Sequence, residues 1–226
     1  MALMKDRQKY FLYEANVGAG LPIISTLQDL ITSGDEIVMI EGIFSGTLSY
    51  LFNNFDGKKP FSQLVADARR KGFTEPDPRE DLSGQDVGRK LLILARQRNL
   101  RMDLKDIDIE NLVPTALRSG TFSEHFFQRF SAGDALFKKR YERARQRGAV
   151  LRYVGSLKGD EATAGLKEYP AKHPFAATKG ADNIIAFNTR RYTSTPLVVQ
   201  GPGAGADVTA MGVFSDILKL LHYLPY

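Results

Sequence analysis

The 226-residue chain contains no cysteine, and this absence excludes several kinds of site. Without a thiol there is no disulfide framework, no thiolate nucleophile and no thiolate metal centre. The three histidines, His125, His173 and His222, lie far apart in the sequence. None has a second histidine or a carboxylate at the spacing of a common zinc motif, so no transition-metal centre is predicted. His173, which precedes a proline, is interpreted as a capping or surface residue.

The chain also lacks a long hydrophobic run. No apolar stretch approaches the roughly 20 residues that a membrane span needs. The first ten residues carry charges where a signal peptide would have an apolar core. With 43% hydrophobic and 25% charged residues, the composition is that of a globular protein. These features predict no membrane partner and a cytoplasmic location, or a plastid one if a transit peptide is missing.

The net charge of +5 is modest and partly local. One basic stretch is broken only by Glu142, and its members are Lys138, Lys139, Arg140, Arg143, Arg145, Arg147 and Arg152. The stretch carries only Tyr141 and Tyr153 as aromatic residues, and a solvated helix face explains it at least as well as a nucleic-acid surface. No nucleic-acid partner is therefore predicted.

Residues 72–90 combine several carboxylates, an amine and two prolines in one stretch. A proline disfavours helical geometry at the residue before it, so Pro76 and Pro78 hold Glu75 and Asp77 away from a helix. Residues 75–81 are therefore predicted to form a stiff acidic turn.

A helix is predicted over residues 84–97, with Ser83 as its N-cap and Asp86 three residues later. On this helix Asp86 and Lys90 lie one turn apart on one face. The spacing alone leaves two interpretations open. The pair is either a surface salt bridge worth roughly a few tenths of a kcal/mol, or part of a site for a small substrate with an ammonium and a carboxylate group.

The same run of residues resembles the homoserine dehydrogenase signature. The matching positions are Ala68, Gly72, Phe73, Thr74, Asp77, Pro78, Asp81, Leu82, Gly84, Asp86 and Lys90. The similarity continues through residues 13–22, 41–50 and 201–205, so it covers nearly the whole chain.

This resemblance implies an oxidoreductase that interconverts L-homoserine and L-aspartate 4-semialdehyde with NAD or NADP, on the route to threonine, methionine and isoleucine. Carried over by position, Lys90 is the acid/base at the aldehyde oxygen, and Asp86 orients it or the substrate. Glu75 and Asp81 hold the substrate's ammonium group and the catalytic groups. The chemistry agrees, because hydride delivery to a carbonyl leaves charge on oxygen that a positioned amine can neutralise.

A glycine-containing loop at residues 16–20 is predicted to lead into a helix over residues 22–32. In the resembled family this loop binds a monovalent cation, Na or K, and oxygen ligands suit such a hard cation. The alternative is a tight turn that needs its glycines only for geometry. The family's ligands fall here on the Glu14 side chain and the backbone oxygens of Val17, Ala19 and Leu21.

The loop at residues 201–206 formally satisfies the glycine fingerprint of a dinucleotide site. A genuine fingerprint is followed by a strand and by an acid about 20 residues on, and neither fits before Tyr226. The loop is interpreted instead as backbone that approaches the nicotinamide end of a cofactor held mainly by another segment. The resemblance places Gly205 beside that cofactor.

Hydrophobic patterning predicts an α/β (α+β) fold: a mixed, largely antiparallel sheet with helices on one face, plus remnants of a Rossmann-type nucleotide domain. A short buried strand is expected at residues 11–13, after the tail of a helix at residues 5–10. Residues 36–43 are expected as a central strand, followed by a helix opening at Ser45, which either caps that helix or helps to bind a substrate carboxylate. Further helices are expected at 60–71, 122–130, 134–147 and 207–224. Further strands are expected at 150–155, 162–169, 183–192 and 196–200, with short turns at 159–160, 179–180 and 194–195.

Four regions are predicted on these grounds. Residues 1–21 end a nucleotide-binding domain and carry the cation loop, and residues 22–153 form the substrate and catalytic region. Residues 154–205 supply dimerisation strands for a homodimer, and residues 206–226 form a helix that returns to the nucleotide domain. The resemblance also implies an N-terminal nucleotide-binding segment upstream, and in some members of the family a fused aspartate kinase. The alternative is a non-catalytic module for amino-acid binding and dimerisation.

Overall fold

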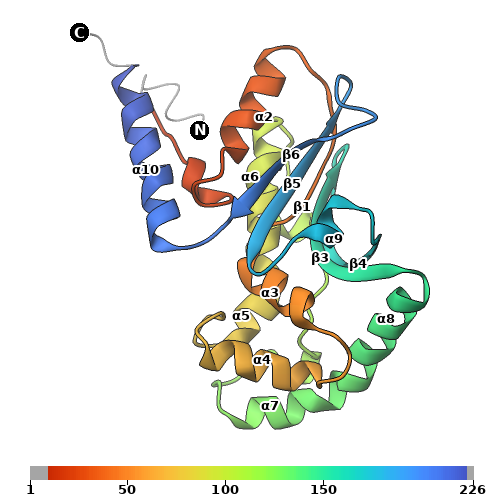
Figure 1. Cartoon of the computed structure of the whole chain (residues 1–226). Coiled ribbons are helices and arrows are strands. Elements are labelled where there is room, and N and C mark those ends of the chain that lie inside the picture. Colours follow the sequence, from red (N-terminus) through yellow and green to blue (C-terminus); the bar gives the residue numbers. More distant parts are fainter. Residues whose placement is uncertain (1–9, 223–226) are drawn as a thin grey trace.

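The computed structural model describes residues 10–222 and contains a six-stranded sheet (Figure 1). The strand order is β2-β4-β3-β1-β5-β6. Every neighbouring pair is antiparallel except β2 with β4, which confirms the predicted mixed, largely antiparallel sheet. The strands are β1 (Ile37–Ile43), β2 (Asp108–Ile109), β3 (Ala149–Lys158), β4 (Glu161–Pro170), β5 (Asp182–Thr189) and β6 (Leu197–Pro202).

Strand β1 is central, as its apolar run predicts, because it pairs with β3 on one side and β5 on the other. Gly42 lies opposite Gly155 of β3 and Ile185 of β5. A Cβ atom on Gly42 would lie 2.6 Å from the carbonyl oxygen of Ile184, so a side chain at this position would push β5 away.

Three helices pack on one face of the sheet: α2 (Ile23–Thr32), α3 (Gly46–Asn54) and α6 (Gln85–Gln97). Their apolar stripes, with Leu27, Leu48 and Leu91 fully or almost fully buried, form the main core with the inner side chains of the strands. The prediction that helices cover one face of the sheet is thus confirmed for these three helices.

A short helix, α9 (Pro174–Ala177), covers part of the opposite face and was not predicted. It lies in the connection that the sequence presented as a short turn at residues 179–180. Phe175 anchors it in a second, smaller core with Ile43 and Val154. His173 caps it by accepting a hydrogen bond from Phe175 N at 3.2 Å, as the capping interpretation predicts.

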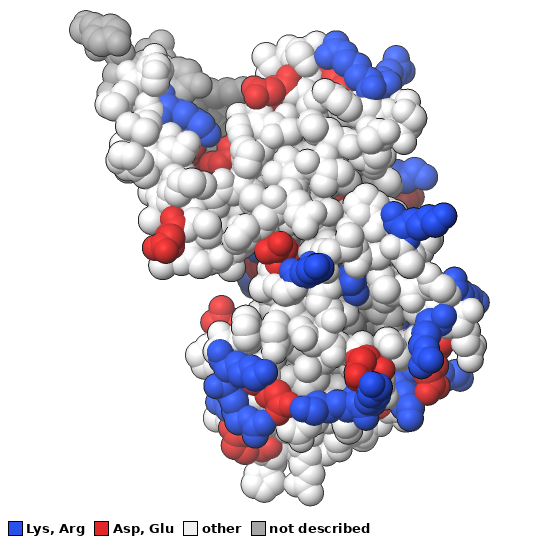
Figure 2. Space-filling model, in the orientation of Figure 1, with Lys and Arg blue, Asp and Glu red and all other residues white. Residues whose placement is uncertain are grey.

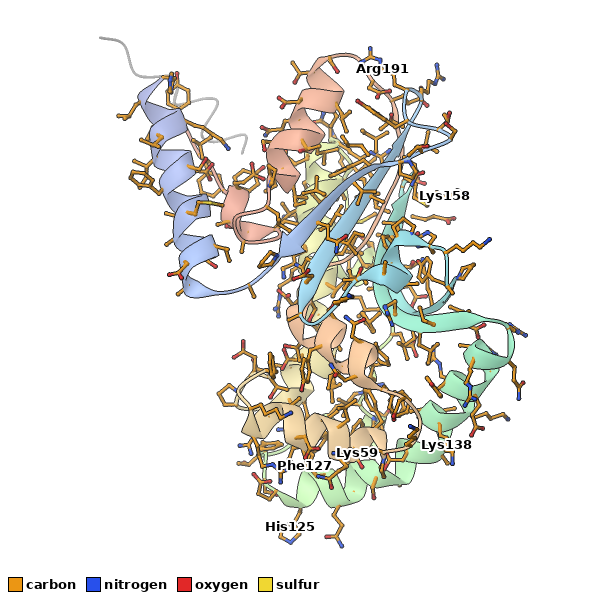
Figure 3. The ribbon with its side chains drawn as sticks, viewed as in Figure 1. Lys59, His125, Phe127, Lys138, Lys158 and Arg191 are labelled. Carbon is orange, nitrogen blue, oxygen red and sulfur yellow. The ribbon has the colours of Figure 1, made fainter. Side chains whose placement is uncertain are left out.

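Helices below the sheet form a separate end of the molecule (Figure 1). They are α4 (Phe61–Arg70), α7 (His125–Phe130) and α8 (Asp134–Gln146). Their core is aromatic, and the rings of Phe61 and Phe137 stack at 4.1 Å. Figure 3 shows Lys59 and Lys138 at this end, far from Lys158 and Arg191 at the opposite end of the sheet. Single 3-10 turns complete the chain: η1 (Glu14–Asn16), η2 (Leu104–Asp106), η3 (Thr115–Leu117) and η4 (Ser131–Gly133).

Helix α10 (Ala206–Leu221) stands beside η1 and exposes an apolar face. The side of the molecule that carries it is mostly uncharged in Figure 2, whereas the helices below the sheet carry many charges. The large apolar side chains exposed on α10 are Met211, Val213, Phe214, Ile217, Leu218 and Leu221. Within residues 10–222, no helix is both long and apolar enough to cross a membrane.

The expected strand at residues 11–13 is wrong, because this segment forms no ladder with another strand. Phe11 is 54% exposed and stacks on Tyr13 with the ring centroids 5.1 Å apart. The apolar run therefore reflects a local aromatic contact. The expected helix at residues 5–10 lies almost entirely outside the described residues.

Candidate active site

The acidic turn expected at residues 75–81 is partly helical, because α5 (Pro78–Leu82) begins inside it. Asp77 has the extended backbone that precedes a proline, with φ −105° and ψ 103°. Its carboxylate accepts a hydrogen bond from Arg79 N at 3.0 Å and so caps the helix. Pro78 occupies the first turn, where its missing N–H is not needed. Pro78 thus keeps Asp77 out of helical geometry and is itself the first residue of α5.

Helix α6 is confirmed, but Ser83 is not its N-cap. That position belongs to Gly84, whose φ of 70° lies in the left-handed region that favours glycine. A Cβ atom on Gly84 would collide with the hydroxyl of Tyr153, which donates a hydrogen bond to Glu110 O at 2.7 Å. The Ser83 hydroxyl accepts a bond from Gln85 N at 3.2 Å. The distant Tyr153 therefore decides how this helix begins.

Lys90 extends from α6 into a largely enclosed position. Its Nζ lies 2.7 Å from Asp86 Oδ2 and donates a hydrogen bond to Phe44 O at 2.8 Å. The Lys90 side chain is 16% exposed, whereas that of Asp86 is 54% exposed. An ammonium group has three N–H donors. Two of the donors of Lys90 have partners among the described residues, namely Asp86 and Phe44 O. This arrangement differs from a surface salt bridge, because the ammonium is largely enclosed and also bonds to a main-chain carbonyl.

Two further carboxylates converge near the start of α6. Glu75 N donates to Asp81 Oδ2 at 2.9 Å, which draws the two acidic residues together. Burial raises the pKa of Asp81, and the negative charges of Glu75 and Asp86 raise it further. Three acids that repel one another in this way favour the approach of a cationic group.

The first turn of α3 forms the adjoining wall. Ser45 is its N-cap and accepts a hydrogen bond from Leu48 N at 3.2 Å, which confirms the capping interpretation. The Thr47 hydroxyl donates to Phe73 O at 2.8 Å, and the rings of Tyr50 and Phe73 stack at 4.0 Å. These contacts fasten the segment before α5 to α3.

Arg79 forms the second ion pair of the signature. Its guanidinium donates to both carboxylate oxygens of Asp77 at 2.6 to 2.9 Å. It also donates to the carbonyl oxygens of Leu117, Ser119 and Gly120, at 3.2, 3.3 and 3.0 Å. Arg79 thereby lowers the pKa of Asp77 and ties the loop after η3 to α5. The sequence placed this guanidinium among the acids but did not indicate the loop it holds.

The glycine loop after β6 reaches the same wall. A Cβ atom built on Gly46 would lie 3.9 Å from the Cβ of Ala204, so this loop adjoins the first turn of α3. Gly205 is exposed and has φ 124° and ψ 148°, a backbone conformation that side-chain-bearing residues rarely adopt. Its backbone is therefore open to close approach by a ligand.

The loop expected to bind a cation has a structural contact that the sequence did not predict. The buried carboxylate of Glu14 accepts hydrogen bonds from Ile24 N at 2.6 Å and Ser25 N at 3.0 Å, and so caps α2. The Nζ of Lys219 lies 3.4 Å from the same carboxylate. Ala19 has a left-handed φ of 55°, and its carbonyl faces Gly212 of α10. In residues 10–222 no group of three acidic, histidine or cysteine side chains could hold a metal ion.

Several basic side chains between residues 138 and 152 have defined structural partners. Arg140 pairs with Glu110, and Arg143 pairs with Glu168 at 2.7 Å, which ties α8 to the sheet. Arg152 is buried, and its guanidinium donates to main-chain carbonyls, among them Phe52 O at 3.0 Å.

The described residues thus bring together a largely enclosed amine, converging carboxylates and a glycine loop. The family model of homoserine dehydrogenase matches residues 22–218. The chain therefore belongs to the homoserine dehydrogenase family.

Three relatives illustrate the match. The chain is 55% identical over 224 residues to the chloroplastic bifunctional aspartokinase/homoserine dehydrogenase 1 of Arabidopsis thaliana, covering 98% of this chain and 25% of that protein. It is 46% identical over 225 residues to the homoserine dehydrogenase of Schizosaccharomyces pombe, covering 96% of this chain and 60% of that protein. A hyperthermophilic archaeal homoserine dehydrogenase in complex with NADPH shares the fold, with a TM-score of 0.73 and 21% identity over 100% of this chain and 60% of the other. The chain thus spans only part of each relative.

Proposed function

We propose that the protein containing this chain interconverts L-homoserine and L-aspartate 4-semialdehyde with NADP or NAD, in the biosynthesis of threonine, methionine and isoleucine. Family membership supports this activity. The observation that carries it is the Lys90 ammonium, held by Asp86 and Phe44 O with one N–H directed to no partner among the described residues. The predicted location, cytoplasm or plastid, stays a prediction.

In this proposal Lys90 moves the proton. As hydride reaches the aldehyde carbon, negative charge grows on the oxygen, and Lys90 donates a proton to it. In the reverse direction Lys90 accepts the hydroxyl proton of homoserine. Asp86 orients the ammonium, while Glu75 and Asp81 bind the ammonium group of the substrate, which relieves the repulsion between these acids.

The bound nicotinamide cofactor supplies or accepts the hydride. Gly205 would lie beside this cofactor. It fits this place because it is exposed and because its backbone conformation excludes most side chains. The first turn of α10 follows directly, and helix N-termini favour anionic groups. The archaeal relative, whose structure is a complex with NADPH, supports a cofactor of this type.

The exposed apolar face of α10 would then pack against the nucleotide-binding segment, with residues 1–21 and 206–226 as the parts of this chain that belong to it. Met211, 54% exposed here, offers a test. Peroxide should oxidise Met211 more slowly in the full-length protein than in the 226-residue chain. Equal rates would mean that the segment does not cover this face.

We also propose a monovalent cation, Na or K, at Glu14 and the backbone oxygens of Val17, Ala19 and Leu21. A carboxylate has about four acceptor sites, and the amides of α2 together with the Lys219 ammonium use only part of them. The cation would neutralise Glu14 and fasten the loop. In the full-length enzyme, Glu14→Gln keeps an acceptor for these amides but loses the charge, so activity or melting temperature should become less sensitive to added Na or K. Unchanged cation dependence would remove the assignment.

A homodimer built by the strands in residues 154–205 is the remaining proposal. Strand β6 is an edge strand of the sheet, and Val198 on it is 36% exposed. An exposed edge invites pairing with another chain unless it is covered. Sedimentation of the full-length protein at micromolar concentration should give a dimer, and a clean monomer would contradict it.

The activity is tested by NADP- or NAD-dependent oxidation of homoserine by the full-length protein. Turnover of homoserine, with little turnover of threonine as a control substrate, would support the assignment. Binding of homoserine without turnover would replace it with the non-catalytic module.

A further inference from the structure

Asn183 of β5 is fully buried beside the candidate active site. Its Nδ2 donates to Phe44 O at 3.2 Å, and the same oxygen accepts the bond from Lys90 Nζ at 2.8 Å. A carbonyl oxygen has two lone pairs and can only accept, so the amide must present its N–H side to Phe44. One carbonyl thus holds both the asparagine and the lysine.

The same amide nitrogen of Asn183 also lies against the glycine loop, at Gly203. A Cβ atom built on Gly203 would collide with Nδ2 and Cγ of Asn183. Position 203 must therefore be a glycine for the loop to lie where it does. Asn183 therefore fills the space between the carbonyl that supports Lys90 and the loop that leads to Gly205.

Stability does not explain an asparagine here. Within the described residues its buried Oδ1 has no hydrogen-bond partner, and such an acceptor costs free energy. Leucine has a similar shape and would avoid this cost. Thr189, equally buried on the same strand, differs, because its hydroxyl donates to Asp35 Oδ2 at 2.6 Å and accepts from Tyr192 N at 3.0 Å.

We propose that Asn183 is a positioning residue. It fixes the Phe44 carbonyl, and with it the Lys90 ammonium, relative to the glycine loop. This inference rests on the proposed function, in which Lys90 moves the proton while the cofactor beside Gly205 exchanges the hydride. Both transfers involve one substrate carbonyl group, so their sources must keep a fixed separation.

The first experiment compares Asn183→Leu with Thr189→Val in the full-length enzyme. Asn183→Leu should lower kcat by roughly 10- to 100-fold, keep KM for homoserine within about twofold and leave the melting temperature unchanged or higher. Thr189→Val should do the opposite, with a lower melting temperature and kcat within about twofold. A lower melting temperature with kcat preserved in Asn183→Leu would make Asn183 a structural residue and overturn the proposal.

A second experiment does not depend on turnover. Asn183→Leu removes the N–H that fixes the Phe44 carbonyl, so the Lys90 amine should become more mobile and more accessible to acetic anhydride. Mass spectrometry at pH 8 should therefore show acetylation of Lys90 accelerated by at least about threefold, with exposed Lys158 as the internal reference. An unchanged rate overturns the role of Asn183. Absence of turnover in the unmodified enzyme would instead overturn the proposed function, and the labelling result would still decide the placement of Lys90.

Discussion

The signature brings two ion pairs together, Asp77 with Arg79 and Asp86 with Lys90, and they differ in what remains unpaired. The Arg79 guanidinium bonds to both oxygens of Asp77 and to three main-chain carbonyls. The Lys90 ammonium bonds to one carboxylate and one carbonyl. Arginine offers a planar set of donors suited to several fixed acceptors, whereas lysine is a compact charge that can give up a proton.

The two cations, which lie close together in the sequence, therefore differ in how many of their donors are used by the fold. Arg79 is committed to holding a loop on α5, with its side chain 14% exposed. Lys90 is similarly enclosed at 16%, yet only two of its three donors have partners among the described residues. Burial alone therefore does not distinguish these two cations, but the number of occupied donors does.

The largest effect is expected from Lys90→Ala in the full-length enzyme. Loss of proton transfer should lower kcat for homoserine oxidation by roughly 10² to 10⁴, while the melting temperature stays near that of the unmodified enzyme. If Asp86 and Lys90 were only a salt bridge, turnover would persist and the loss of stability would stay under about 1 kcal/mol. Steady-state kinetics with thermal unfolding separates the two cases.

Arg79→Ala should break the architectural pair. Its removal leaves the half-buried Asp77 and three carbonyls without their donor, so the free energy of unfolding should fall by about 2–4 kcal/mol. The matched control is Arg96→Ala, which removes an exposed pair with Asp103 and should cost less than about 1 kcal/mol. Urea unfolding measures both, and equal losses would show that Arg79 is an ordinary surface residue.

A smaller, pH-dependent effect on the melting temperature should distinguish Asp81 from Asp77. The pKa of Asp81 is raised in the folded protein, so its carboxyl destabilises the fold increasingly as pH rises from the unfolded pKa through the folded one. Asp81→Asn should therefore raise the melting temperature at pH 7, with a difference that shrinks toward pH 4.

Asp77→Asn is the opposite case. Arg79 lowers the pKa of Asp77, so the stabilisation is present above the unfolded pKa and disappears as pH falls through the folded value. This variant should melt lower at pH 7. Shifts of the same sign in both variants would contradict the contrast between the two acids.

The sequence predicted those parts of the structure in which local spacing determines the geometry. Asp86 and Lys90 share a helix face because they lie four residues apart, and the apolar stripe of α6 fixes which face is buried. The strands β1 and β3 to β6 followed from their apolar patterns in the same way. Ser45 as a cap and His173 as a cap needed only their neighbours in the chain.

Predictions from local spacing failed where a residue distant in the sequence determines the local structure. Ser83 satisfied a capping pattern, but Tyr153 of β3 leaves room only for a glycine at the start of α6. Pro78, which suggested a turn, instead begins α5, since Asp77 caps this helix and Arg79 anchors it to a distant loop. Asn183 carries no local pattern, because its contact with Phe44 exists only once β5 has paired with β1.

The central claim, that Lys90 moves a proton rather than only holding a charge, is tested most directly by kcat of Lys90→Arg in the full-length enzyme. Arginine keeps the positive charge for Asp86 but does not readily release a proton. We predict that this variant folds, binds NADPH and loses homoserine oxidation by at least about 100-fold. Turnover within about threefold of the unmodified enzyme would show that charge alone suffices and would remove Lys90 from the proton transfer.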